Sequence, residues 1–525
     1  MITGKNYIGN HTSKLGSTTF KTFNPKENKE NPWVFYEAST EEINEAVTLA
    51  TEAFKMYRNV SGIKKAEFLR AIANEIDVLE NQIVETFTKE SGLPEGRALG
   101  EKGRTVGQLR AFATLLEEGS WVDATIDTAE PERKPIPKVD LRKMLKPLGP
   151  VVVFGASNFP LAYSTAGGDT ASALASGCPV IVKSHPMHAA TGELVASAVQ
   201  KAAIKTNMPT GVFSNLNSSG IEVGKQLVMH PNVKAVGFTG SIKGGTALFQ
   251  MANNREEPIP VFAEMGSINP VVILPSALKN GDWAKQYAGS ITLGAGQFCT
   301  NPGLILALNS SDLNLFLNEL KTEISKIEAV CMLHPNIYKN FNNLKDEVSS
   351  QDGVETVVSN ENSVSINFAK HQVVKITGKQ FIENSVFHKE VFGPFSVVVA
   401  CENITELEHI ISNLEGQLTG TILGDIKEIE QHQTLLEALT NRVGRVIFNG
   451  VPTGVEVCPS MLHGGPFPAS TDSRFSSVGT SAIKRWVRPV SFQNCPNNLL
   501  PDELKNENPL SIMRLVNNTF SSKAI

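Results

Sequence analysis

A cysteine at position 299 lies in a segment whose residue types suit covalent chemistry. It stands in GAGQFCTNPG at 294–303, among small and polar residues, directly after a segment with helical periodicity. A free thiol has a pKa of about 8.5, so a nucleophilic cysteine needs a nearby base, cation or helix N-terminus to attack at neutral pH. The alternative, and for a lone cysteine the more frequent case, is a buried structural residue.

Two other segments contain polar side chains that could assist such a nucleophile. FAEMGSINP at 262–270 places Glu264 at the end of an apolar strand, where burial would raise the pKa of its carboxyl group toward the range of a general base. FGASNFP at 154–160 follows another strand and is expected to open a helix, and the Asn158 amide could donate to an oxyanion there. The alternatives are a capping or salt-bridged Glu264 and an N-capping Asn158.

Three further segments could bind a dinucleotide. FTGSIKGG at 238–245 is a strand-to-helix turn, and the helix N-terminus at Gly240 and Ser241 could hold a phosphate. IVKSHP at 181–186 places Lys183 at a strand end, where it could meet a ribose or a phosphate, and EVFGP at 390–394 joins Glu390 to a rigid turn. The alternatives are an ordinary glycine-rich turn and a solvated lysine.

The elements that must position these residues alternate between strand and helix. Residues 40–118 have mostly helical periodicity, and Ser39 and Thr40 can cap the first helix. Apolar runs then predict strands at 151–154, 179–183, 212–214, 234–238, 259–263 and 271–274, with helices at 160–176, 189–204, 219–229, 241–253 and 281–293. A second alternation follows, with strands near 304–308, 395–400 and 443–448. This βαβ pattern favours a doubly wound α/β fold.

The composition of the whole chain restricts the class of protein. The 525 residues are 41% hydrophobic and 19% charged with a net charge of −5, which argues against nucleic acid as a partner. The apolar runs are far shorter than the ~20 residues of a membrane-spanning helix, and the N-terminal residues do not resemble a secretory signal. The six cysteines lie far apart and form no metal-binding motif. We therefore expect a cytoplasmic protein with no membrane partner and no metal site.

Taken together, the motifs resemble one family along nearly the whole chain. GASNFP, VKSHP, FTGS, EMGSINP, GAGQFCTNPG and EVFGP are similar to motifs of the aldehyde dehydrogenase superfamily and stand in that family's order. The resemblance implies a Rossmann-like cofactor domain at 1–120 and 149–262 and an α/β catalytic domain at 263–450. It also implies a small β oligomerisation element with the C-terminal tail at 121–148 and 451–525, and hence a homodimer or homotetramer.

The resemblance also implies a role for each candidate residue. Cys299 attacks a small-molecule aldehyde to give a thiohemiacetal, whose alkoxide lies between the Asn158 amide and the Cys299 backbone N–H. After hydride transfer to a nicotinamide, Glu264 activates the water that hydrolyses the remaining thioester. Lys183, which we count with the catalytic residues, and Glu390 hold the two riboses. The other residues expected at the cofactor are Phe154, Gly155, Ala156, Ser157, His185, Pro186, Gly240, Ser241 and Phe392.

Pro186 is a departure that bears on the choice of cofactor. NAD-specific relatives often carry a glutamate three residues after the lysine, on the adenine ribose hydroxyls. Without that carboxylate a 2′-phosphate meets no like-charge repulsion, and His185 and Lys183 could favour it. Relatives that oxidise fatty aldehydes have a threonine there, which donates to the phosphate as a proline cannot. We therefore expect use of both NADP and NAD, with NADP mildly preferred.

The expected substrate follows from two longer stretches. LAYSTAGGDTASALASGCPVIVKSHP and TGVEVCPSMLHGGPFPASTDSRFSSVGTSAIKRWVRPV resemble the α-ketoglutaric semialdehyde dehydrogenase branch of the family, which converts 2,5-dioxopentanoate to 2-oxoglutarate. Oxidation of fatty or succinic semialdehydes, or a non-catalytic binding protein on the same fold, are the alternatives. The terminal carboxylate of the substrate needs a cation, preferably an arginine. We expect Arg104 and Phe159 to contact the substrate, the alternative being that Arg104 is a solvated surface residue.

Overall fold

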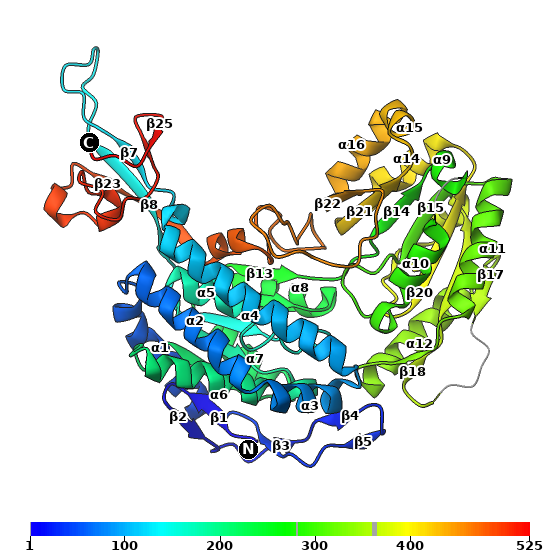
Figure 1. Cartoon of the computed structure of the whole chain (residues 1–525), viewed down its shortest axis with the longest axis horizontal. Helices are drawn as coiled ribbons and strands as arrows, with labels where there is room; N and C mark the ends of the chain where they lie inside the picture. The colour runs from blue at the N-terminus through cyan, green and yellow to red at the C-terminus, as the bar shows by residue number, and fades with distance from the viewer. Residues whose placement is uncertain (1, 280–281, 360–364) are drawn as a thin grey trace.

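Three β-sheets organise the chain in the computed structural model, which describes residues 2–279, 282–359 and 365–525 (Figure 1). The first sheet has the order β13-β12-β9-β10-β11-β1-β2. Five of its strands are parallel to one another: β9 (Val151–Phe154), β10 (Val180–Lys183), β11 (Phe213–Leu216), β12 (Ala235–Thr239) and β13 (Val261–Glu264). The antiparallel strands β1 (Asn6–Ile8) and β2 (His11–Ser13) complete one edge. The expected doubly wound α/β fold is confirmed.

Helices cover both faces of this sheet because successive residues of each strand point to opposite sides. Val151 and Val153 pack with one helix layer, whereas Val152 packs with the other. The first layer contains α2 (Gly62–Val78), α3 (Glu80–Ser91), α4 (Glu95–Glu118), α5 (Gly168–Ser176) and α6 (Ala189–Lys205). The second contains α1 (Thr40–Tyr57), α7 (Glu222–Met229) and α8 (Ile242–Asn253).

The helix boundaries agree with the sequence pattern at some positions and differ at others. Ser39 caps α1 in a complete capping box with Glu42, as expected for the start of that helix. The prediction of a helix over 160–176 is wrong in its first half, because α5 begins at Gly168. Residues 155–167 instead fold back on themselves, with the backbone N–H of Ala156 donating to the carbonyl of Tyr163 (2.8 Å). FGASNFP therefore lines a compact turn and does not open a helix.

The second sheet has the order β17-β19-β20-β15-β14-β21-β22, with only β17 antiparallel to its neighbour. Its strands are β14 (Pro270–Ile273), β15 (Leu304–Leu308), β17 (Glu355–Ser359), β19 (Gln372–Thr377), β20 (Phe395–Cys401), β21 (Gln417–Leu423) and β22 (Val443–Phe448). One face is covered by α9 (Pro275–Lys279), α10 (Trp283–Thr292) and α11 (Ser311–Ser325). The other packs mainly against α12 (Pro335–Ser349), α13 (Gly378–Glu383), α14 (Ile404–Asn413), α15 (Ile426–Gln431) and α16 (Gln433–Arg442). The helix expected at 281–293 corresponds to α10, and its first position, 281, lies outside the described residues.

The third sheet projects away from the other two (Figure 1). It contains β23 (Val487–Gln493), β8 (Leu141–Pro147), β7 (Thr125–Asp127), β24 (Arg514–Val516) and β25 (Thr519–Ser521), over a small core of its own. The remaining strands form short pairs: β3 (Thr19–Phe20) with β6 (Phe35–Tyr36), β4 (Phe23–Asn24) with β5 (Lys29–Glu30), and β16 (Val330–Cys331) with β18 (Phe368–Ala369).

Residues 451–486 follow β22 but do not join the third sheet. The sequence analysis had assigned them, with the rest of 451–525, to the oligomerisation element and C-terminal tail. This segment, orange in Figure 1, passes between the first two sheets and reaches the candidate site described below. The exact domain boundaries stay a prediction. No helix in the described ranges is long and apolar enough to cross a membrane.

Candidate active site

The parallel strands of the first sheet bring four of the predicted segments to one edge. Phe154 at the end of β9 is in register with Lys183 of β10 and with Phe238 of β12, and Thr239 is in register with Glu264 of β13. The strand order reverses on either side of β9, and ligands of doubly wound sheets bind at such a switch point, outside the carboxyl ends of the strands. Segments that are more than a hundred residues apart in sequence, such as those of Phe154 and Glu264, therefore share one edge.

The loop that carries Cys299 is held in an unusual backbone conformation. It follows a 3₁₀ turn at Leu293–Gly296, in which Gly294, Ala295 and Gly296 all have positive φ values. A Cβ atom at Gly296 would overlap the carbonyl of Gly393, so glycine is needed where this loop crosses the EVFGP loop. The Asn269 side chain then donates to the Cys299 carbonyl (2.8 Å), which ties the loop to EMGSINP. Three predicted motifs are thus packed directly together.

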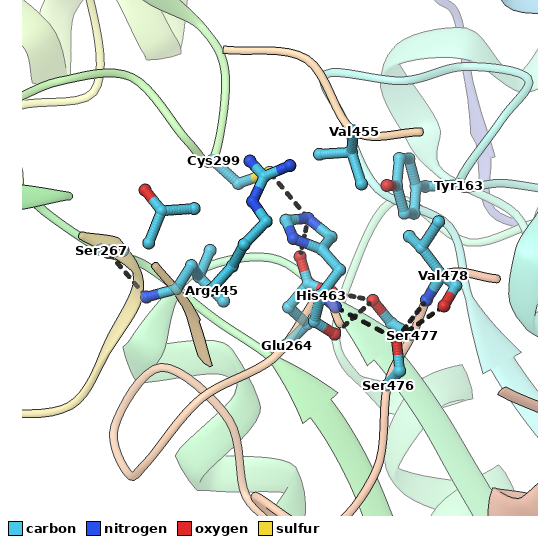
Figure 2. Close-up of polar contacts among 12 residues, drawn as sticks. Tyr163, Glu264, Ser267, Cys299, Arg445, Val455, His463, Ser476, Ser477 and Val478 are labelled. Atoms are coloured by element: carbon cyan, nitrogen blue, oxygen red, sulfur yellow. Dashed lines mark hydrogen bonds and ion pairs between the residues drawn. The ribbon is translucent and has the colours of Figure 1, made fainter. Parts of the chain in front are cut away.

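Cys299 forms a contiguous chain of polar contacts with His463 and Glu264 (Figure 2). Its sulfur lies 3.3 Å from Nε2 of His463, and the same nitrogen lies 2.7 Å from Oε1 of Glu264. The other oxygen of Glu264 accepts a hydrogen bond from the Ser477 hydroxyl. His463 and Glu264 are both buried, so their interaction is little screened by solvent. The thiol, imidazole and carboxylate together are the groups that an activated cysteine requires.

The electrostatics of this pair differ from the sequence-based expectation for Glu264. Burial alone raises the pKa of the carboxyl group, but the charge and hydrogen bond of His463 outweigh it and hold the pKa below the usual value of 4.5. Burial lowers the pKa of His463, but Glu264 and Cys299 oppose this and raise it from 6.5 to about 10. Glu264 is therefore an ionised partner of a histidinium and not an isolated buried acid, which corrects the prediction of a raised pKa.

His463 and Ser477 are functional candidates that sequence reasoning missed. Both come from the segment 451–486, where the backbone N–H of Ser477 donates to the carbonyl of His463 (2.8 Å). The histidine stands before a glycine pair in SMLHGGPF, with no periodicity or spacing that marks it as catalytic. Only the longer stretch around His463, which resembles one branch of the family, could have pointed to this histidine. One potential metal-ligand atom from each of His463, Cys299 and Glu264 lies within 4.8 Å of the other two. The sequence analysis, which considered the spacing of the cysteines, did not predict this cluster.

Asn158 lies close to the cysteine loop, as its predicted role requires. Its side-chain amide donates to the carbonyl of Gln297 (3.2 Å), two residues before Cys299. Its own carbonyl accepts from Arg97 (3.2 Å), which also pairs with Glu101. Asn158 and Cys299 line one cleft, so the amide can reach an oxygen that develops charge beside the sulfur.

Aromatic side chains adjoin the cysteine. The ring of Phe159 packs edge-on against Phe298 (5.5 Å between centroids) and against Tyr163 (5.0 Å). The guanidinium of Arg97 lies over both Phe159 and Phe298. These rings give an apolar wall beside the nucleophile, which can exclude water from a bound carbonyl group.

A cleft of ≈ 770 Å³ extends from Cys299 over the carboxyl end of the first sheet. Among the predicted cofactor residues, Ser157, Gly240, Ser241, Glu390 and Phe392 line it. The Ser241 side chain caps α8 by accepting from the backbone N–H of Gly244 (3.1 Å), a local role that the sequence analysis did not assign to it. The helix N-terminus still opens on the cleft, where backbone N–H groups can bind a phosphate.

The other predicted cofactor residues lie at the same sheet edge but do not line this cleft. Burial lowers the pKa of Lys183 to about 8, and its ammonium donates to the carbonyl of Ser218 (3.3 Å), so it is not a solvated lysine. His185 stacks on His188, and Pro186 begins the 3₁₀ turn between them. Phe154, Gly155 and Ala156 are buried; Phe154 packs against Phe238, and the Ala156 carbonyl lies 2.8 Å from Nε2 of His188.

Arg104 is not the solvated surface residue that was the alternative to a substrate contact. It is half-buried, and its terminal nitrogens donate to the carbonyl of Val455 (2.5 Å) and to the hydroxyl of Tyr163 (3.1 Å). The ring of Tyr163 in turn lies 6.3 Å from that of His463. Arg104 therefore supports the wall of the site, and its contact with substrate stays a prediction.

Comparisons with known proteins identify the family. The aldehyde dehydrogenase family model matches residues 11–477. α-Ketoglutaric semialdehyde dehydrogenase 2 of Azospirillum brasilense is 46% identical over 98% of this chain and 98% of its own, and an α-ketoglutaric semialdehyde dehydrogenase of Acinetobacter baylyi is 43% identical over 99% of each. The chain belongs to the aldehyde dehydrogenase family.

Solved structures confirm the fold. Betaine aldehyde dehydrogenase from Staphylococcus aureus in complex with NAD⁺ superposes with a TM-score of 0.81 at 20% identity, covering 94% of this chain and 96% of that one. Methylmalonate-semialdehyde dehydrogenase from Oceanimonas doudoroffii gives a TM-score of 0.81 at 19% identity, covering 94% and 99%. At such identities the likeness establishes the fold alone.

Proposed function

We propose that this enzyme oxidises 2,5-dioxopentanoate to 2-oxoglutarate with NADP⁺ or NAD⁺. The observation that carries the proposal is the chain of polar contacts from Cys299 through His463 to Glu264, in which Cys299 and Glu264 line the cleft of ≈ 770 Å³. The two relatives named for α-ketoglutaric semialdehyde, which match nearly the whole chain, support the choice of substrate. Fatty aldehydes and succinic semialdehyde are the competing substrates, and the presence of the complete contact series argues against a non-catalytic binding protein.

The first step is attack of the Cys299 sulfur on the aldehyde carbon to form a thiohemiacetal. The adjacent His463, whose pKa is raised to about 10 so that it is charged at neutral pH, stabilises negative charge on the attacking sulfur. The oxygen of the thiohemiacetal accepts hydrogen bonds from the Asn158 amide and the Cys299 backbone N–H. A nicotinamide dinucleotide held in the cleft would supply the hydride acceptor for the former aldehyde carbon, and a thioester would then remain on Cys299.

Hydrolysis of the thioester needs a base for water. Glu264 is ionised and buried beside Cys299, so it can accept the proton of a water molecule that attacks the acyl carbon. His463 and Ser477 hold the two carboxylate oxygens and thereby fix the orientation of Glu264. The carbon–sulfur bond then breaks, the acid is released, and the sulfur is again paired with His463.

The cleft residues fit a nicotinamide dinucleotide. The carboxyl group of Glu390 is partly exposed in the cleft; burial raises its pKa to about 7, and a hydrogen bond from the backbone N–H of Ser267 opposes this shift. A partly desolvated carboxyl group that lines the cleft suits the hydroxyls of a ribose. Ser241 and Gly240 at the N-terminus of α8 suit the pyrophosphate. The Lys183 ammonium, at the same sheet edge but outside the cleft lining, suits the other ribose. We further propose that NADP⁺ is mildly preferred, because Pro186 offers no carboxylate to repel a 2′-phosphate.

The third sheet supports the proposed division into cofactor, catalytic and oligomerisation parts. Several apolar side chains on and around it are exposed in the single chain, including Leu141, Leu499, Met513 and Phe520. Contact with a second copy would cover such residues, so we propose a homodimer or homotetramer assembled through this sheet. All six cysteines are free thiols, which supports a cytoplasmic location.

A steady-state comparison of aldehydes tests the proposed function. The full-length enzyme is assayed with 2,5-dioxopentanoate, succinic semialdehyde and a long-chain aldehyde, each with NADP⁺ and with NAD⁺. The proposal expects the highest kcat/KM with 2,5-dioxopentanoate and activity with both cofactors. A higher kcat/KM with the long-chain aldehyde would favour the fatty aldehyde alternative, and no oxidation of any aldehyde would favour the non-catalytic one.

A further inference from the structure

Arg445 is a charged residue beside the nucleophile that the reaction steps above do not use. It comes from β22, and its side chain reaches toward Cys299 and His463 (Figure 2). The residue is half-buried, and its Nε atom is fully buried without a hydrogen-bond partner among the described residues. Its guanidinium therefore carries an N–H group that the described residues leave without an acceptor.

The remaining hydrogen bonds of Arg445 go only to neutral acceptors. One terminal nitrogen donates to the carbonyl of Gly454 (3.1 Å) and the other to the carbonyl of Pro452 (2.9 Å), with Met461 sulfur 3.8 Å from the first. Within the described ranges of the chain no carboxylate pairs with this side chain, whereas Arg97 pairs with Glu101 and Arg485 with Asp169. A cation that is withdrawn from water without a counter-ion is costly, and an anionic ligand would remove that cost.

Arg445 lies near the catalytic groups. Burial lowers the pKa of its guanidinium, and Cys299 and Tyr163, which act in the opposite direction, are near enough to interact with it electrostatically. Arg104 bonds to Val455, immediately after Gly454, so the two arginines hold adjacent residues of one loop. Arg104, whose guanidinium lies 5.5 Å from the centre of the Tyr163 ring, is thus a second positive charge on the same side of Cys299 as Tyr163.

We infer that Arg445 binds the terminal carboxylate of the aldehyde substrate, so that this wall of the site selects short aldehydes that end in an acid. The inference rests on the proposed function, because it names the part of the enzyme that recognises the charged end of 2,5-dioxopentanoate. A guanidinium can donate two parallel hydrogen bonds to a carboxylate, which fixes the chain of the substrate as well as its charge. A fatty aldehyde would displace water from the guanidinium without supplying a counter-ion, and this desolvation cost would disfavour binding of the fatty aldehyde.

Two other roles for Arg445 predict different kinetics. If its charge serves only to favour the Cys299 thiolate, its loss slows the oxidation of every aldehyde by the same factor. If it serves only to hold the loop at 452–454, a neutral donor in its place restores activity with every aldehyde. A carboxylate-binding role alone predicts an effect that depends on the charge of the substrate.

The test measures kcat/KM for 2,5-dioxopentanoate and for pentanal, which has the same number of carbons and no charge. Arg445→Gln keeps hydrogen-bond donors for the loop and removes the charge, while Arg445→Lys keeps the charge without the two-pronged geometry. Arg442→Gln is the matched control. Arg442 is the last residue of α16, three residues before Arg445, and it donates to the carbonyl of Ser412 on α14. Thermal unfolding of each variant verifies the fold, and inhibition by 2-oxoglutarate reports carboxylate binding without turnover.

We expect Arg445→Gln to lower kcat/KM for 2,5-dioxopentanoate by about tenfold or more and for pentanal by less than about threefold. The inhibition constant of 2-oxoglutarate should rise by a similar factor, and Arg445→Lys should fall between the wild type and the glutamine variant. Equal losses with both aldehydes, or no loss with either, would overturn the inference. A wild-type enzyme that does not prefer 2,5-dioxopentanoate over pentanal would refute the proposed substrate itself, and that result is visible before any variant is made.

Discussion

The Nε2 atom of His463 lies 3.3 Å from the sulfur of Cys299. This nitrogen also pairs with Glu264, so the imidazole is held as a cation beside the nucleophile. Because the pKa of His463 is raised to about 10, the cation is present at neutral pH and is lost as the pH rises through that value. Because the pKa of Glu264 is lowered, its charge is lost only as the pH falls below the normal range of a glutamate. The ion pair therefore spans the neutral range.

Replacement of His463 by glutamine is expected to reduce the reactivity of Cys299. The adjacent cation stabilises negative charge on the attacking sulfur, and its loss should slow alkylation of Cys299 by iodoacetamide at pH 7 by about tenfold, equivalent to ~1.4 kcal/mol. The measurement uses a background in which the partly exposed Cys458 and Cys495 are replaced by serine, so that labelling reports mainly on Cys299. An unchanged alkylation rate would mean that His463 does not activate the thiol.

Glu264→Gln should impair hydrolysis of the thioester more than its formation. The amide is nearly isosteric but cannot accept the proton of the attacking water. A rapid-mixing experiment should show a burst of reduced cofactor, about one equivalent per active site, followed by a slow steady state. Ser477→Ala is a useful comparison, because it removes one hydrogen bond to Glu264 but leaves the carboxylate. Unchanged turnover in the glutamine variant would exclude Glu264 as the base.

Pro186→Glu should shift the cofactor preference toward NAD⁺. Pro186 begins the 3₁₀ turn that follows the Lys183 strand, so a carboxylate there would oppose a 2′-phosphate and could accept bonds from ribose hydroxyls. We expect the ratio of kcat/KM for NADP⁺ to that for NAD⁺ to fall by about tenfold, since one charge contact contributes ~1.4 kcal/mol. Pro186→Gln controls for loss of the proline ring. If the ratio is unaffected, this turn does not read the adenine ribose.

Arg104→Met tests the substrate contact expected from the sequence. Loss of a charge-assisted contact should raise KM for 2,5-dioxopentanoate by about tenfold, or ~1.4 kcal/mol, and spare an uncharged aldehyde of similar length. Arg104 also holds Val455 and Tyr163, so a purely structural role predicts equal effects on both substrates. Equal effects would leave Arg104 as a support for the wall of the site.

The sequence predicts those parts of the site that depend on local patterns. Glu264 and Lys183 end apolar strands, and parallel pairing places such strand ends together without further information. The capped start of α1 at Ser39 is equally local. The turn at 155–167 was not predictable from periodicity, because its fold depends on tertiary contacts such as that of His188 with the Ala156 carbonyl.

The contacts that sequence reasoning missed join residues that are far apart in the sequence. His463 is 164 residues from Cys299, and Ser477 is 213 residues from Glu264. No spacing rule connects such residues, since only the path of the segment 451–486 between the sheets brings them together. For the same reason the sequence could not foresee that a histidinium would reverse the pKa shift that burial alone would give to Glu264.

The account depends most on a covalent acyl intermediate at Cys299. The wild type and the Glu264→Gln variant are mixed with 2,5-dioxopentanoate and NADP⁺, quenched with acid, and analysed by intact-protein and peptide mass spectrometry. We predict that the variant accumulates one 2-oxoglutaryl group on Cys299, and that Cys299→Ala accumulates none and retains less than about one per cent of wild-type activity, a loss of at least ~2.7 kcal/mol in transition-state stabilisation. Acylation of a different residue, or substantial turnover by Cys299→Ala, would contradict the account.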